Sequence, residues 1–161
     1  MSLFANLAAP AVPVDDAGAI YHAALLGSEP LPGFFAAVAD ELFAVAGNDN
    51  AAAFLNQVGR RMAAARPVAG AETLEVLEEA MNGLLLSNRW GWVRLAEVEA
   101  GIRIRHGALP VSPGEAASPA AAALLEGLYT LWMQQAGGGE HLQARRSGAD
   151  ESGCVELLYG R

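Results

Sequence analysis

Residues 74–106 read LEVLEEAMNGLLLSNRWGWVRLAEVEAGIRIRH, and the spacing of their apolar residues changes midway. As far as about Ser87, apolar residues recur at helical spacing, which is typical of one buried helix face. Beyond the Trp90-Gly91 corner, apolar and polar residues alternate on both sides of a turn at 99–101, which is typical of a hairpin. The stretch therefore predicts a helix over about 71–87 and a β-hairpin over about 92–106.

The predicted hairpin has two unlike faces. One face is apolar and fits a protein core. A tryptophan and three arginines share the other face, and these residues are Trp92, Arg94, Arg103 and Arg105. Since Trp and Arg are enriched where proteins contact one another, we expect this face to be an interface with another copy of the chain.

Acidic residues crowd the first half of the helix before the hairpin. Glu78 and Glu79 invite an interpretation as a general acid/base pair. Adjacent residues on a helix point in different directions, however, so two such carboxylates do not face each other. We therefore expect both glutamates to lie on a solvated helix face.

Two further helices are predicted upstream of this stretch. The first covers about 33–46, where Phe34, Val38, Leu42 and Val45 recur at helical spacing. Phe35 and Phe43 widen this apolar stripe, which is expected to be buried. The second covers about 49–65 and contains Gly59. Glycine costs about 1 kcal/mol relative to alanine inside a helix, so we expect a neighbouring backbone to approach closely there.

Downstream, a loop rich in proline and glycine over 107–119 leads to another helix. This helix starts at Ser118-Pro119, a cap followed by a favourable first residue, and ends at the glycines 137–139. Segments 141–146 and 154–159 predict a second hairpin. The order helices, hairpin, helix, hairpin predicts an α+β fold in which the two hairpins form a four-stranded antiparallel sheet.

Residues 1–32 are predicted to be an N-terminal arm, separate from a single domain over 33–161. Prolines at positions 10, 13, 30 and 32 surround a short apolar segment at 19–26 that can form one helix. A loosely ordered tail is the alternative.

The charge and hydropathy of the chain exclude some function classes. A formal net charge of -8 argues against a nucleic-acid partner, because phosphates are bound by clustered Lys and Arg. No apolar run reaches the ~20 residues that a membrane-spanning helix needs. The N-terminus lacks a basic region ahead of an apolar run, so we expect a cytoplasmic protein, with the periplasm as the alternative.

The sequence contains no motif of a catalytic, metal or cofactor site. The three histidines, His22, His106 and His141, are far apart, and His106 is expected to be an ordinary polar residue at a strand end. The single Cys154 is expected to be a small buried side chain. We therefore expect no enzymatic activity, no cofactor and no bound metal.

Five segments occur in an order and spacing that match a known family. They are VGRRMA (58–63), MNGLLL (81–86), the Trp90-Gly91 corner, IRIRHGALP (102–110) and LLEGLYTLW (124–132). Over about residues 34–146 the chain resembles the cellulose synthase operon protein D family. The LEGLY segment (125–129) and the strand ending in H-x-x-LP are the most specific parts, whereas residues 1–32 are longer and richer in alanine than in that family.

The resemblance implies a small α/β protein that forms a ring-like homo-octamer, a tetramer of dimers. It implies a non-catalytic accessory role in bacterial cellulose synthesis, in which the ring organises synthase complexes or guides nascent β-1,4-glucan chains into crystalline fibrils. The implied partners are further copies of the chain, other cellulose synthase subunits and a proline-rich accessory protein.

If a glucan binds, Tyr21, Trp90 and Trp92 are the residues that can stack on a sugar ring, although Trp90 also fits a place in the core. Two other functions remain open from the sequence. One is a small-ligand-binding or regulatory domain unrelated to cellulose, with an apolar pocket. The other is a glucan hydrolase, which needs two carboxylates facing each other across a cleft.

Overall fold

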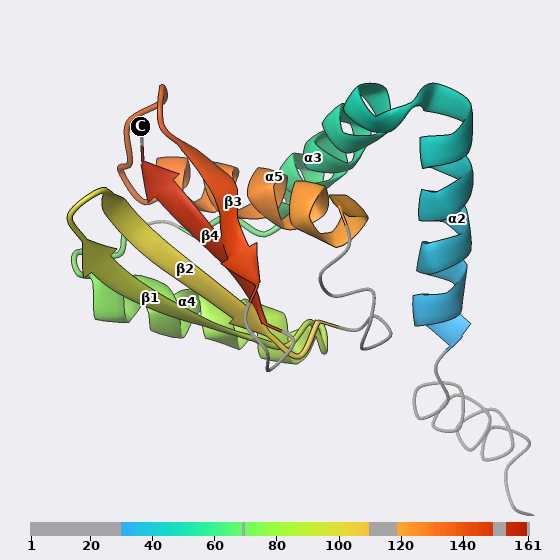
Figure 1. The fold of residues 1–161 in the computed structure, drawn as a ribbon. Coiled ribbons are helices and arrows are strands. Elements are labelled where there is room, and N and C mark those ends of the chain that lie inside the picture. Colours follow the sequence, from blue (N-terminus) through green and yellow to red (C-terminus); the bar gives the residue numbers. More distant parts are fainter. Residues whose placement is uncertain (1–29, 69, 110–118, 150–153, 161) are drawn as a thin grey trace, which may run out of the picture.

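The computed structural model describes residues 30–68, 70–109, 119–149 and 154–160 (Figure 1). Its helices are α2 (Pro30–Ala46), α3 (Asn48–Ala65), α4 (Leu74–Ser87) and α5 (Pro119–Gln135). Its strands are β1 (Trp92–Val98), β2 (Gly101–Gly107), β3 (Gln143–Ala149) and β4 (Val155–Gly160). The predicted α+β fold, with one helix between two hairpins, is confirmed.

The two hairpins join into one antiparallel sheet with the strand order β1-β2-β4-β3. The second strand of each hairpin lies in the middle, where Ile104 of β2 faces Leu157 of β4. The edge strands are therefore β1 and β3.

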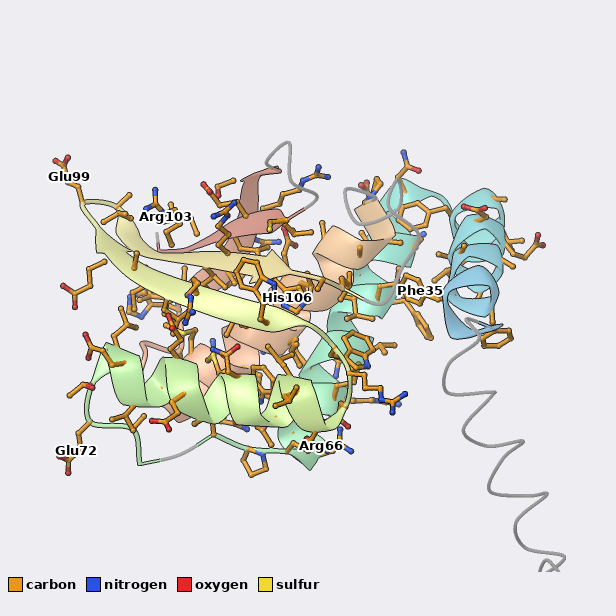
Figure 2. All side chains as sticks on the ribbon, turned by 90° about the horizontal axis from the view of Figure 1, so that it is seen from below. Phe35, Arg66, Glu72, Glu99, Arg103 and His106 are labelled. Atoms are coloured by element: carbon orange, nitrogen blue, oxygen red, sulfur yellow. The ribbon has the colours of Figure 1, made fainter. Side chains whose placement is uncertain are left out.

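The elements form layers behind one face of the sheet. Helices α4 and α5 cover that face, α3 packs behind α5, and α2 extends from α3 away from the sheet (Figures 1 and 2). The core lies between the sheet and the helices, where Met81, Leu125 and Ile104 are fully buried. None of the helices in the described ranges combines the length and apolarity needed to cross a bilayer.

Two glycines bring the backbones of α3 and α5 into direct contact. A Cβ added at Gly59 would overlap the carbonyl oxygen of Leu124, and one added at Gly127 would overlap the carbonyl oxygen of Asn56. The close approach predicted at Gly59 is confirmed, and it is reciprocal. This contact allows α5 to be buried along nearly its whole length, between α3 and the sheet.

Several predicted boundaries differ from the observed ones. Helix α2 begins at Pro30, inside the predicted arm, because a proline in the first turn of a helix loses no intrahelical hydrogen bond. Helix α4 begins at Leu74 because the Thr73 hydroxyl caps it by accepting from the Val76 N–H at 3.3 Å. The division into an arm and one domain stays a prediction, since residues 1–29 lie outside the described part of the chain.

The glycine contact predicts opposite effects for two Gly-to-Ala substitutions. Gly59→Ala places a methyl group against the α5 backbone, so we expect the free energy of unfolding to fall by about 3 kcal/mol. Gly83→Ala lies at an exposed position of α4 with no atom near the new methyl group, so it should stabilise the protein by up to about 1 kcal/mol. Urea unfolding curves measure both, and equal effects would contradict the contact.

Candidate interaction surfaces

Side chains of α4 close the β1 edge of the sheet. The Asn82 amide donates to the Val93 carbonyl at 3.0 Å and accepts from the Val93 N–H at 2.9 Å. Glu78 accepts from the Leu95 N–H at 2.7 Å and pairs with the Arg94 guanidinium at 2.5 Å. These helix side chains occupy backbone groups that a further strand would need.

Side chains of α5 close the β3 edge in the same way. The Thr130 hydroxyl accepts from the Ala144 N–H at 2.9 Å, and Glu126 accepts from the Arg146 N–H at 2.8 Å. Glu126 also lies 3.7 Å from the Arg145 guanidinium. At both edges, then, one glutamate binds a strand N–H and the arginine that precedes it.

The expectation that Glu78 is solvated was wrong. Its side chain is only 19% exposed because it is held against β1, whereas Glu79 is exposed as expected. Glu78 and Glu126 lie at opposite edges of the sheet and each binds backbone. They do not form a facing carboxylate pair of the kind that glycoside hydrolysis requires.

The sheet register places the four predicted interface residues on one face, which points away from α4 and α5. Arg94 lies opposite Arg105. Arg103 lies two residues before Arg105 on β2, so its side chain points to the same face. Trp92 lies opposite Gly107, and its ring occupies the space that a Cβ at Gly107 would take. All four side chains are exposed, Trp92 at 38%.

The second hairpin adds residues to this face that the sequence analysis did not place there. Leu158 lies opposite Arg103, and Arg145 lies on the other side of Leu158. A register shift between Arg146 and Gly148 interrupts the alternation of β3, which hid this pattern in the sequence. We call the assembled surface the arginine face, formed by Trp92, Arg94, Arg103, Arg105, Arg145 and Leu158.

Helix α2 carries apolar residues on two of its sides. Phe35 and Leu42 pack against the core. The expectation that Phe34, Val38 and Val45 are buried was wrong, since they are 68%, 45% and 77% exposed. The helical spacing was correct, but the protomer covers only the neighbouring side of the helix. We call these three exposed residues the α2 stripe.

The outer side of α4 combines acidic and apolar residues. Glu75 and Glu79 are exposed, and hydrogen bonds from its own backbone N–H and from the Thr73 hydroxyl lower the pKa of the Glu75 carboxyl. Val76 and Leu86 are exposed on the same side. We call this surface the acidic face, formed by Glu72, Glu75, Val76, Glu79 and Leu86.

His106 lies in the core, which contradicts the expectation of an ordinary polar residue at a strand end. It is fully buried because the β2 residue at this position faces α5, where its Nδ1 and the Tyr129 hydroxyl share a hydrogen bond of 2.6 Å. Burial lowers the pKa of His106 to about 4, and the ring's Nε2 is buried without a hydrogen-bond partner among the described residues. Burial also raises the pKa of Tyr129.

The part of the chain that the structure describes contains a buried cysteine and a small apolar hollow. Within the described ranges, no group of His, Cys, Asp or Glu side chains is arranged to hold a metal ion. Cys154 is buried, as predicted. The apolar hollow beside Trp90 and Trp132 has a volume of about 30 Å³, which is room for about one water molecule.

Of the three residues suggested for glucan contact, the structure describes Trp90 and Trp92. Tyr21 lies outside the described residues. Trp90 is half-buried and packs against the core, and Trp92 keeps part of its ring exposed on the arginine face. Their role in glucan binding stays a prediction.

Comparison with known proteins relates the chain to one family. A family model for the D subunit of cellulose synthase matches residues 19–160. A cellulose synthase operon protein D of Komagataeibacter xylinus is 36% identical over 118 residues, which cover 66% of this chain and 75% of the relative. The same values hold for the protein of that name from Komagataeibacter sucrofermentans, and a second K. xylinus protein is 33% identical over 117 residues with the same coverage.

Substitution of the two adjacent glutamates tests the closed β1 edge. Glu78→Ala leaves the Leu95 N–H without its acceptor, so the free energy of unfolding should fall by about 2 kcal/mol. Glu79→Ala removes an exposed carboxylate one residue away and should change stability by less than about 0.5 kcal/mol. Thermal or urea unfolding gives both values, and similar losses would argue against the edge contact.

The buried histidine predicts a loss of stability in acid. The unfolded chain protonates His106 near its ordinary pKa of 6.5, whereas the folded chain does so only near 4. The contribution of His106 to the free energy of unfolding is therefore fully present above about pH 7 and is lost as the pH falls. At pH 5 the loss should be about 2 kcal/mol.

The measurement is urea unfolding at about pH 7.5 and pH 5, compared with His106→Gln, which cannot titrate. Between these two pH values, the free energy of unfolding of His106→Gln should change by about 2 kcal/mol less than that of the wild type. His141→Gln, at an exposed position, should change as much as the wild type. An unchanged slope in His106→Gln would show that other groups cause the acid sensitivity.

Proposed function

This chain belongs to the cellulose synthase operon protein D family, and on that premise we propose that it is a non-catalytic accessory protein that works as a homo-oligomer. Membership in the family assigns it a role in cellulose synthesis. The finer proposal is a ring-like octamer, built as a tetramer of dimers, that organises synthase complexes or guides nascent glucan chains into crystalline fibrils. Its other partners would be further cellulose synthase subunits and a proline-rich accessory protein.

The exposure of the α2 stripe is the main support for self-association. Phe34, Val38 and Val45 lie on one side of a helix that packs mainly on α3. Large apolar side chains gathered on one exposed helix side favour burial against another protein surface. A two-fold contact between the α2 stripes of two copies buries both at once, because a two-fold axis brings the same patch of each copy together.

The fold further supports assembly through faces of the protomer. Helix side chains bind outward backbone groups at Val93 and Leu95 of β1 and at Ala144 and Arg146 of β3, which disfavours the extension of one sheet through these edges. The exposed α2 stripe and the exposed arginine face therefore offer the better contacts for neighbouring copies.

Glucan guidance rests on the family and on the position of Trp92. A partly exposed aromatic ring beside arginine side chains suits contact with the apolar face and the hydroxyl groups of a sugar. The location of the protein, expected to be the cytoplasm with the periplasm as the alternative, stays a prediction.

Charged substitutions in the α2 stripe test the assembly. We expect the wild-type chain at micromolar concentration to have a mass several times that of the monomer by light scattering. The double variant Phe34→Glu with Val38→Glu should shift to smaller species while keeping its circular dichroism, because both side chains are exposed in the protomer. Ala44→Glu, an exposed position on another side of α2, should assemble normally.

The same variants test the role in cellulose synthesis. A bacterium that lacks its own member of this family and expresses the Phe34→Glu, Val38→Glu variant should produce less crystalline cellulose than one expressing Ala44→Glu. A strictly monomeric wild-type protein, or normal fibrils with the double variant, would contradict the proposal.

A further inference from the structure

A closed ring of dimers needs two different contacts between copies of the chain. A two-fold contact of α2 stripes pairs two copies and buries both stripes. Association of more than two copies therefore requires another surface. The need for this second contact rests on the proposed homo-oligomer.

We propose that the arginine face of one copy docks on the acidic face of α4 of a second copy. The contact is heterologous, because one patch meets a different patch on the neighbour. The arginine face of each copy is therefore occupied by a second copy of the same chain, which contacts it through its acidic face.

Charge complementarity is the first argument. The chain as a whole carries a formal charge of -8, yet the outward positions of the described strands carry four arginines and one glutamate, Glu156. Arg94 is paired with Glu78, and Arg145 with Glu126. The two arginine side chains are nevertheless 70% and 66% exposed, whereas the two glutamate side chains are only 19% and 17% exposed. Cationic groups therefore point outward, and Arg103 is exposed between the two edges of the sheet.

The apolar residues of the two faces also correspond. Trp92 and Leu158 lie among the arginines, and Val76 and Leu86 lie beside the glutamates of α4. Exposed ion pairs alone contribute little to affinity, so burial of these apolar side chains would supply much of it. The charges would mainly set which patch meets which.

The positions of the two faces fix the mode of association. Figure 2 shows Arg103 on one side of the protomer and Glu72, at the start of the acidic face, on the opposite side. One copy therefore cannot neutralise its arginine face with its own acidic face. Head-to-tail contacts of this kind form rings when the rotation between copies closes, and the α2 contact then pairs the copies.

Charge reversal with rescue tests this contact. Arg103→Glu and Glu79→Arg each place like charges across the proposed interface, so each variant should stop at the dimer held by the α2 stripes. The two reversals combined in one chain restore opposite charges and should recover the wild-type mass. Light scattering at low salt measures all forms, and Arg61→Glu, an exposed arginine on α3, is the matched control that should assemble fully.

Several results would overturn the inference. Unchanged mass in both single reversals would show that these faces do not meet in the assembly. Loss of mass without recovery in the combined variant would show that the arginine face meets some other surface, a glucan or another protein included. Loss of mass in Arg61→Glu as well would indicate a general charge effect.

Failure of this inference is distinguishable from failure of the proposed function. If only the head-to-tail contact is wrong, the Phe34→Glu, Val38→Glu variant still loses its dimers while the reversals have no effect. If self-association itself is wrong, the wild-type chain is monomeric and neither set of variants changes its mass.

Discussion

Four helix side chains form hydrogen bonds with backbone groups of the two edge strands, where a further strand would otherwise bind. Asn82 and Glu78 bind the outward backbone groups of β1, and Thr130 and Glu126 bind those of β3. Buried or half-buried backbone groups need such partners, because an N–H without an acceptor costs about as much as a lost hydrogen bond. These contacts fix α4 and α5 relative to the sheet and close both edges. A protomer with closed edges can associate through its faces without the risk of uncontrolled strand addition.

The contact between α3 and α5 makes this arrangement possible. Gly59 and Gly127 let the two backbones touch, so α5 can lie deep between α3 and the sheet. From that position it supplies Thr130 and Glu126 to β3 and Tyr129 to His106 of β2. The LEGLY segment and the strand that ends at His106, which carry much of the family resemblance, therefore meet in the core.

The surfaces proposed for self-association lie on the outside of the packed core. Membership in the cellulose synthase operon protein D family connects the chain to cellulose synthesis. The α2 stripe is apolar, the arginine face is cationic, and the acidic face lies across the protomer from it.

Local patterns in the sequence determined the elements of this protein. The change of apolar spacing after Trp90 predicted a helix and a hairpin, and strict alternation placed Trp92, Arg94, Arg103 and Arg105 on one face. Side-chain direction in a helix or strand follows from local geometry, so these predictions held. The same alternation puts His106 on the inward face of β2 with Ile104. The tertiary structure alone decided which side of α2 faces the core, why Glu78 is held against a strand and that Tyr129 meets the His106 ring. Each depends on a neighbour distant in sequence, and no local period encodes which distant backbone or side chain a residue will meet.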